Sequence, residues 1–254
     1  MIITFLGTGT SQGVPVVACQ CRVCKSINEK DKRLRTSILI ENQTDRIVID
    51  SGPDFRQQML RENVSCLSGL VFTHEHKDHT AGMDDIRGFN FVQQQPTKVY
   101  ATQFVQECLK KEYHYIFNGP DYPGLPQVQF HTITNQKFSV ANTELIPIEV
   151  LHHKLPVLGF RIGKFTYITD ANFISEESKQ KISGSEVLVL NALRKEKHIS
   201  HFNLNEAIAL ATELNVKTTY FTHISHQMGF HESIENELPT GMHLAYDGLK
   251  IEID

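Results

Sequence analysis

Three histidines and one aspartate occur within six consecutive positions of the chain. They are His74, His76, Asp78 and His79. An apolar run over 67–72 precedes them and predicts a buried strand, so they would lie at the carboxyl end of that strand. Residues two apart in an extended loop point the same way, so the first two histidines can bind one metal ion together. Asp78 and His79 follow where the pattern becomes helical, and they face another direction. Imidazole and carboxylate suit zinc, iron or manganese, and two such pairs predict two metals that share a bridging group.

Five cysteines are present, and three of them crowd into Cys19-Gln-Cys21-Arg-Val-Cys24. These spacings are too tight for a set of disulfides in a cytosolic chain, so we interpret the motif as a thiolate site for structural zinc. Free buried thiols are the alternative, because the residues alone do not indicate a fourth ligand. Cys66 and Cys108 lie in apolar or helical contexts and are expected to be core or surface thiols.

The composition is that of a soluble globular enzyme with one large domain or two small ones. The chain has 254 residues, of which 40% are hydrophobic and 21% are charged. A formal net charge of −4 argues against broad electrostatic binding to nucleic acid, which requires a basic surface. No apolar run approaches the ~18 residues of a membrane span, and the first residues resemble a strand rather than a signal peptide. We therefore predict a cytoplasmic protein.

The hydrophobic pattern alternates between strand-like and helix-like segments along the chain. Strands are predicted at 2–6, 36–41, 46–50, 98–101, 128–167 (several) and 218–221, and helices at 53–62, 80–94, 102–117 and 206–214. The segments 36–41 and 46–50 predict one hairpin, and Asp247-Gly248 is the signal for another. Proline and glycine indicate a loop at 118–126, and the glycine-rich stretch 7–13 predicts a shaped turn. Strands followed by helices, twice over, predict an α/β fold of two mixed sheets with outer helices.

The sequence Thr73-His-Glu-His-Lys-Asp-His79 resembles the signature of the metallo-beta-lactamase superfamily. This resemblance implies a four-layer αββα sandwich with a binuclear metal site at one edge. It also implies that Asp170, after an apolar strand, bridges both metals, and that His223 and either His152 or His153 complete the ligands. Asp50 ends a similar strand, and we interpret it as an outer-shell or turn residue.

A narrower resemblance runs over nearly the whole chain. The early cysteine motif, Thr222-His-Ile-Ser-His-Gln227 and the stretch 234–241 are similar to the family of phosphoribosyl 1,2-cyclic phosphodiesterases of bacterial phosphonate breakdown. The resemblance implies a structural zinc held by Cys19, Cys21, Cys24 and His226, which supplies the fourth ligand. It also favours His152 over His153, and it assigns phosphate contact and proton transfer to His201.

Two stretches depart from the pattern of that family. They are 84–90 and 191–194, and we expect the pocket to differ there. Arg87 and Arg194 are candidates for contact with a phosphate oxygen, and the alternative for each is a surface ion pair. For this reason the sequence does not predict the phosphoribosyl cyclic phosphate itself as the substrate.

Together these observations predict one metallo-beta-lactamase-fold hydrolase domain over residues 1–254, with a cysteine-rich zinc-binding loop at about 14–33. The expected activity is that of a binuclear metal-dependent phosphodiesterase acting on a small, cyclic or linear, diester. One ion would be held by His74, His76 and His152, the other by Asp78, His79 and His223, with Asp170 as the bridge. The expected cofactors are two zinc or manganese ions and one structural zinc. A hydroxide between the catalytic metals would attack phosphorus while Asp78 and His201 assist.

Three alternatives remain open at this level. A ribonuclease Z-like nuclease has a related site but uses a basic arm, and no basic insertion is visible here. A thioester or lactone hydrolase would use the same metals without His201. A non-enzymatic metal-binding scaffold is disfavoured because no ligand position is lost. For partners, we expect a small phosphodiester substrate, neither nucleic acid nor membrane, and a homodimer as one option for assembly.

Overall fold

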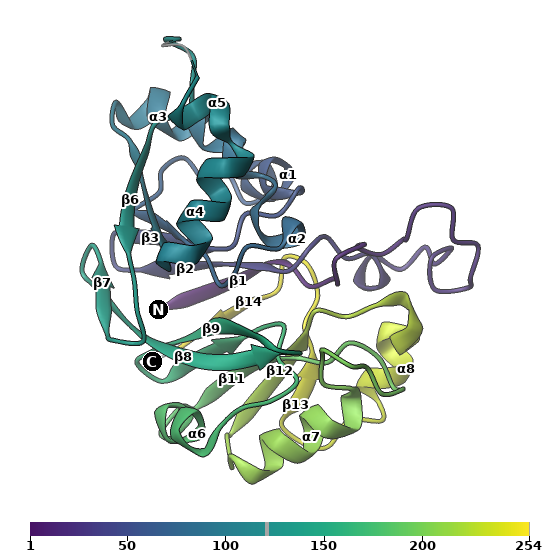
Figure 1. The fold of residues 1–254 in the computed structure, drawn as a ribbon. Helices are drawn as coiled ribbons and strands as arrows, with labels where there is room; N and C mark the ends of the chain where they lie inside the picture. The colour runs from purple at the N-terminus through teal and green to yellow at the C-terminus, as the bar shows by residue number, and fades with distance from the viewer. Residues whose placement is uncertain (120–121, 254) are drawn as a thin grey trace.

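The computed structural model describes residues 1–119 and 122–253. Within these ranges the chain forms two sheets of seven strands each, in the orders β14-β1-β2-β3-β4-β5-β6 and β13-β12-β11-β10-β9-β8-β7. Each sheet is antiparallel in one part and parallel in the other, so both are mixed. Helices cover the outer face of each sheet (Figure 1). The predicted four-layer αββα sandwich is confirmed.

The first sheet uses mostly the amino-terminal half of the chain. Its strands are β1 (Ile2–Gly7), β2 (Ser37–Asn42), β3 (Asp45–Ile49), β4 (Gly69–Val71), β5 (Thr97–Ala101), β6 (Val128–Thr132) and β14 (Lys250–Glu252). The helices on its side are α1 (Phe55–Arg61), α2 (Lys77–Thr80), α3 (Arg87–Gln93), α4 (Gln103–Glu112) and α5 (His114–Phe117). The antiparallel pairing of β2 with β3 confirms the first predicted hairpin.

The second sheet follows in the chain. Its strands are β7 (Phe138–Val140), β8 (Thr143–His152), β9 (Leu155–Ile162), β10 (Phe165–Ile168), β11 (Val187–Asn191), β12 (Thr218–Thr222) and β13 (Met242–Leu244). The helices on its side are α6 (Glu176–Ile182), α7 (Leu204–Glu213) and α8 (His231–Glu235). Short 3-10 turns cover Glu29–Asp31, Met83–Ile86 and His226–Met228.

Alternation of side chains along the strands creates separate cores on the two faces of each sheet. In β2, Ile38 and Ile40 pack in the core between the sheets, whereas Leu39 packs in the core beneath the helices. Successive residues of a strand point to opposite faces, so a fully apolar strand serves both cores. The core between the sheets also receives Phe160 and Tyr167 from the second sheet. This packing joins the two sheets into one sandwich.

The carboxyl ends of the parallel strands bring polar residues to one edge. Three residues just beyond β3, β10 and β12 adopt the left-handed backbone conformation. They are Asp50 (φ +65°), Asp170 (φ +57°) and His223 (φ +56°). Non-glycine residues rarely adopt this conformation, and where they do the surrounding structure must hold them there. All three residues therefore lie at the same edge, just beyond the ends of their strands.

Three predicted helices differ from the structure at their ends or are interrupted. The helix predicted at 53–62 begins only at Phe55, and Asp54 precedes it with its carboxylate bound by Arg35. The helix predicted at 80–94 breaks at Gly82, whose N–H donates to Ser51 O instead of continuing the helical pattern. A Cβ at Gly82 would lie 2.2 Å from Gly52 O, so this close approach requires glycine.

The helix predicted at 102–117 is divided into α4 and α5 at Tyr113. The side chain of Tyr113 is buried, and its hydroxyl donates to Thr80 O over 2.9 Å. The loop predicted at 118–126 continues into the start of β6, and its positions 120–121 lie outside the described residues.

The hairpin predicted at Asp247-Gly248 is wrong. A turn is present there, with Gly248 at φ +86°, but β13 pairs with β12 and β14 pairs with β1 in the other sheet. The Asp247 carboxylate accepts hydrogen bonds from Thr8 Oγ1 and from Leu34 N, which bind the turn to the first sheet. The segment therefore crosses between the sheets instead of folding back on itself.

The cysteine-rich loop projects beyond the sandwich at the side of α8 (Figure 1). Its base is held by the buried Arg33, whose guanidinium donates to Thr8 Oγ1 and to Ala245 O.

Among residues 1–119 and 122–253, no helix combines the length and the apolar character that a membrane span requires.

Candidate metal centres

The first cluster of ligand atoms contains His74, His76, His152 and Asp170, and these atoms all lie within 4.8 Å of one another. His74 and His76 follow β4, and His152 ends β8 in the second sheet. The ring of His74 lies 4.6 Å from that of His76 and 5.8 Å from that of His152. Of the adjacent histidines His152 and His153, the structure brings His152, which the narrower resemblance favoured, into the cluster.

The second cluster contains Asp78, His79, Asp170 and His223, again within 4.8 Å. Asp78 and His79 lie on the short helix α2, and His223 leaves β12. His79 Nε2 lies 3.1 Å from Asp78 Oδ2, and its ring stacks on that of His223 with centroids 5.8 Å apart. The ring of His79 lies only 4.3 Å from that of His74, yet the two histidines belong to different clusters.

Asp170 belongs to both clusters through different oxygens. Its Oδ1 lies 3.1 Å from His223 Nδ1 and 3.4 Å from His79 Nε2, while its Oδ2 lies 3.8 Å from His74 Nε2. Burial raises the pKa of the Asp170 carboxyl, but the imidazoles of His223 and His79 outweigh this effect and hold the pKa well below its usual range. The ionised carboxylate is thus placed where a bridging ligand would lie.

Buried nitrogen atoms without partners provide a test of whether a metal fits. In the described part of the chain, His74 Nε2, His79 Nε2 and His223 Nδ1 are buried and have no hydrogen-bond partner. Leaving a buried polar atom unpaired is costly, and in both clusters these atoms converge on carboxylate oxygens. A divalent cation would satisfy the nitrogens and carboxylates together, so the donor set fits zinc or manganese.

In three of the candidate ligands, the Nδ1 atom of the histidine ring contacts a protein oxygen. His79 Nδ1 donates to Asp50 Oδ2 over 2.7 Å, and His152 Nδ1 donates to Ser200 O over 2.9 Å. His74 Nδ1 lies 2.9 Å from Thr73 Oγ1. Such outer contacts select the tautomer that leaves Nε2 free to bind a metal. The contact of Asp50 with His79 agrees with the supporting role predicted for this carboxylate.

His201 lies against both clusters. Its ring centroid is 4.6 Å from that of His152 and 4.8 Å from that of His223. His201 Nδ1 is buried and has no hydrogen-bond partner among the described residues. Burial, followed by the neighbouring His223, lowers the pKa of His201 to about 3. His201 does not cap the nearby helix α7, because Asn203 caps that helix with Glu206 in a capping box.

The two candidate arginines lie in different surroundings. Arg194 donates to Gln227 Oε1 over 2.7 Å and to Lys197 O over 3.1 Å, on the segments that carry His226 and His201. Arg87 is half exposed and forms an ion pair with Asp84 over 2.7 Å, as the surface alternative predicted. It also lines a groove of about 550 Å³ between α1 and α3. The structure therefore favours Arg194 over Arg87 as a residue near the clusters.

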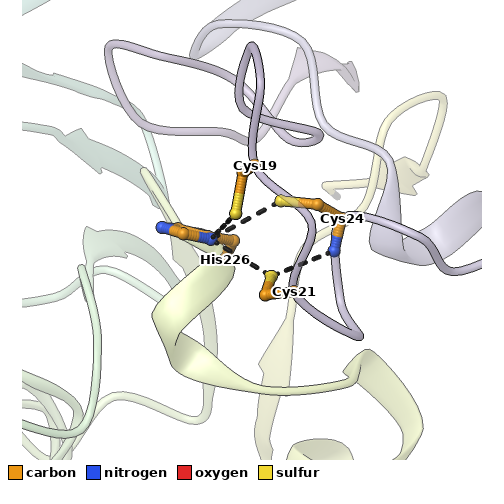
Figure 2. Close-up of side chains that lie close together, drawn as sticks. All are labelled: Cys19, Cys21, Cys24 and His226. Atoms are coloured by element: carbon orange, nitrogen blue, oxygen red, sulfur yellow. Dashed lines mark hydrogen bonds between the residues drawn. The ribbon is translucent and has the colours of Figure 1, made fainter.

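Cys19, Cys21 and Cys24 gather around His226, more than 200 positions away in the chain (Figure 2). Their Sγ atoms lie 3.4, 3.3 and 3.5 Å from His226 Nδ1. One ring nitrogen has a single lone pair and cannot accept hydrogen bonds from three thiols. Tetrahedral zinc with its usual bond lengths would place nitrogen and sulfur ligands about 3.5 Å apart. The geometry thus fits the Cys3His zinc site that the resemblance implied.

The thiols of this group differ in acidity. The backbone N–H of Cys24 and the contact with His226 lower the pKa of Cys21 to about 6, whereas burial raises the pKa of Cys24 to about 11. Zinc binds thiolates, so the lowered pKa of Cys21 favours metal binding by this group.

Residues outside the predicted site also support it. Thr73 joins Asp50 to His74, and Thr10 Oγ1 lies 3.3 Å from His223 Nε2. Asn191 binds the backbone of Ala171, next to Asp170. Thr73 borders the histidine motif, so its contact was within reach of sequence reasoning. Thr10 and Asn191 are far from their partners in the chain, and no pattern indicated those contacts.

Comparison with known proteins connects this site to a family. The family model described as "Beta-lactamase superfamily domain" matches residues 45–224. A crystal structure of a diphosphatase from the PhnP family is 36% identical with a TM-score of 0.93, covering 100% of this chain and 98% of that one. Zinc-bound PqqB from Methylobacterium extorquens shares the fold with a TM-score of 0.80 at 18% identity, covering 100% of both chains.

A curated octanoyltransferase from Porphyromonas gingivalis is 37% identical over 252 residues, which are 98% of this chain and 51% of that protein. The chain thus spans about half the length of this relative. The family match, the fold and the clusters of histidine and aspartate support a metal-dependent hydrolase that resembles PhnP. The chain belongs to the metallo-beta-lactamase superfamily.

Proposed function

We propose that this protein is a binuclear metal-dependent phosphodiesterase that hydrolyses a P–O bond in a small phosphodiester or diphosphate. The observation that carries the proposal is the position of His201, whose buried ring lies against His152 of one cluster and His223 of the other. A phosphoryl group bound across both clusters would lie beside this ring. The similarity to a PhnP-family diphosphatase at 36% identity over the whole chain supports the same class of substrate.

The two clusters would each hold one catalytic ion, zinc or manganese. His74, His76 and His152 would bind the first, Asp78, His79 and His223 the second, and Asp170 both. When bound, such ions lower the pKa of a water molecule and neutralise charge on a phosphoryl group. The protein orients the ligands through Asp50 and Ser200 and buries them, which keeps the charges strong at the reacting centre.

His201 would contact the phosphoryl group as a neutral ring. With its pKa lowered to about 3, the free site holds an uncharged imidazole with one N–H to donate. This state suits a hydrogen bond to a non-bridging oxygen of phosphorus. Proton donation to the leaving alkoxide requires that the bound phosphate, by its negative charge, raise the pKa of the ring. Contact with phosphate is thus the primary role, and proton transfer depends on the charge of the substrate.

Arg194 would assist at the rim of the site. Gln227 and Lys197 O hold its guanidinium, and its buried Nε has no hydrogen-bond partner in the described part of the chain. A guanidinium favours bidentate contact with phosphate oxygens. Arg87, whose charge is paired with Asp84, is not part of this proposal.

The cysteine-rich loop would carry one structural zinc per chain. Cys19, Cys21, Cys24 and His226 form a closed set of four ligands with no open position, which is typical of structural sites. His226 follows His223 by three residues, so the same segment serves both centres. We therefore assign this zinc to folding and to the support of the catalytic edge.

The second candidate function is hydrolysis of a thioester or another acyl compound. The 37% identity to the protein named octanoyltransferase favours it, because that name denotes transfer of an acyl group. The matched part is about half of that protein. The metal clusters alone suit both reactions, because a polarised carbonyl and a polarised phosphoryl group need similar ligands. A ribonuclease Z-like activity has support at the level of the fold alone, from human tRNase Z at 17% identity and a TM-score of 0.67.

A panel of hydrolysis rates tests the assignment. The substrates are bis(p-nitrophenyl) phosphate, a cyclic nucleoside phosphate, a nucleoside diphosphate ester, an acyl thioester, a lactone and a precursor transfer RNA. We expect turnover of one or more of the small phosphorus substrates and a loss of this turnover in Asp170→Asn. If the protein cleaves the thioester efficiently but does not hydrolyse the phosphodiesters or the diphosphate ester, it is instead an acyl hydrolase.

A further inference from the structure

Asn191, at the end of β11, holds the main chain beside Asp170. Its side chain is fully buried, Oδ1 accepts from Ala171 N over 2.7 Å, and Nδ2 donates to Ala171 O over 2.9 Å. The parallel ladder between β10 and β11 ends at the pair Ile168 and Leu190. Beyond this pair the amide of Asn191 makes the two hydrogen bonds that a neighbouring strand would otherwise make. The side chain therefore extends the ladder by two bonds past the last strand residues.

Ala171, which Asn191 holds, directly follows Asp170, and the backbone of Asp170 is strained. Asp170 has φ +57°, a conformation that a non-glycine residue keeps only when neighbouring contacts enforce it. Ala171 O also accepts from Phe202 N over 2.8 Å, whereas Ala171 N donates to Asn191. Loss of Asn191 would leave this buried N–H unpaired and would release one side of the turn. The direction of the Asp170 side chain depends on that turn.

We propose that Asn191 is a positioning residue that sets the metal affinity of both clusters by fixing the turn at Asp170, an inference that rests on the proposed metal function. Asp170 directs one oxygen to His79 and His223 and the other toward His74. A change in the turn moves both oxygens together, so the two sites lose affinity together.

The chain contains a matched control for this contact. Asn90, 8% exposed, holds Gln127 in the same manner, accepting from Gln127 N over 2.8 Å and donating to Gln127 O over 3.1 Å. Gln127 precedes β6 and is not a member of any cluster of candidate ligands among the described residues. Removal of either asparagine breaks such a pair of backbone bonds. Asn90 also donates to Gln95 O and to Thr97 Oγ1, so its loss should disturb the fold at least as much as the loss of Asn191. Only one of the two pairs lies beside a candidate ligand.

The experiment compares Asn191→Leu with Asn90→Leu in the full chain. Leucine has nearly the shape of asparagine but cannot form hydrogen bonds, so it removes the contact without a large cavity. Metal affinity is measured by competition with a chromogenic chelator, and ligand geometry by the visible spectrum of the Co²⁺-substituted protein. We expect both variants to lower the melting temperature. Only Asn191→Leu should weaken the binding of both catalytic ions, by about 10-fold to 100-fold, and shift the Co²⁺ spectrum.

Should Asn191→Leu fail to fold, Asn191→Ser and Asn90→Ser provide the same comparison with a smaller polar side chain. Equal metal affinities in parent and Asn191 variant would show that the residue only stabilises the fold. Equal losses in the Asn191 and Asn90 variants would assign the effect to general loosening and would overturn the proposal. A parent protein that binds no ion at the two clusters would defeat the proposed function itself, and this inference with it.

Discussion

Asp50 accepts a hydrogen bond from His79 Nδ1 over 2.7 Å, at the base of the second cluster. The same carboxylate oxygen accepts from Thr73 Oγ1 over 2.8 Å, and Thr73 in turn contacts His74 Nδ1. One buried carboxylate thus orients a candidate ligand in each cluster, directly in one case and through a hydroxyl in the other. Because ring orientation decides which nitrogen faces the metal, Asp50 is tied to both centres although it belongs to neither.

Asp50→Asn is expected to weaken the binding of both catalytic ions by about 10-fold to 100-fold, because an amide is a poorer acceptor for the N–H of His79. The measurement is chelator competition on the purified variant. Asp45, at the opposite end of β3, provides the control, since its buried carboxylate accepts from Asn142 N and Thr143 Oγ1, away from the clusters. If Asp45→Asn lowers metal affinity as much as Asp50→Asn does, the orienting role is rejected.

Metal analysis should find three ions per chain. The two clusters of nitrogen and oxygen ligands would hold two, and the softer Cys3His set would hold one zinc. Elemental analysis after metal-replete expression measures the total. A mild chelator should remove the two catalytic ions first, because the thiolate site is closed and holds zinc more tightly. A total that stays near one ion per chain is incompatible with two catalytic sites.

Loss of a zinc thiolate should affect the fold more than the chemistry. Cys21→Ser removes one of four ligands, and we expect the melting temperature to fall by at least about 5 °C, because binding of structural zinc contributes to folding. Calorimetry checks this value, with Cys108→Ser on α4 as a control outside the cysteine cluster. Asp170→Asn should behave in the opposite way, retaining most of the fold while abolishing turnover. A Cys21→Ser protein that melts like the parent would refute the structural zinc.

His201→Ala should lower kcat on a phosphodiester by roughly 10²-fold to 10⁴-fold with unchanged metal content. Steady-state kinetics on two substrates separate the roles of the ring. If His201 only contacts phosphate, as its lowered pKa favours, the loss is equal for alkoxide and nitrophenolate leaving groups. If it donates a proton, the loss is larger for the alkoxide, which needs protonation more. An unchanged kcat/KM on every phosphodiester, together with good thioesterase activity, would exclude the phosphodiesterase assignment.

The sequence by itself determined the strand pattern and the local ligand spacing. The order of strand-like and helix-like segments predicted the two mixed sheets, because hydrophobic periodicity is a local property of the sequence. His74, His76, Asp78 and His79 were recognisable because all four lie within one loop and one helical turn. Resemblance to a known family then supplied the distant candidates His152, Asp170, His223 and His226. These roles were outside the reach of spacing arguments, since a single residue carries no local pattern.

Tertiary structure decided which distant residues meet and which of their atoms face each other. Asp170 directs its two oxygens to different clusters because the turn at φ +57° and the amide of Asn191 hold it there. The turn at Asp247-Gly248 looked like a hairpin, but its carboxylate binds Thr8 and Leu34, and the chain crosses to the other sheet. Local sequence selects the type of a turn, whereas the partner of the following strand depends on contacts between segments far apart in the chain.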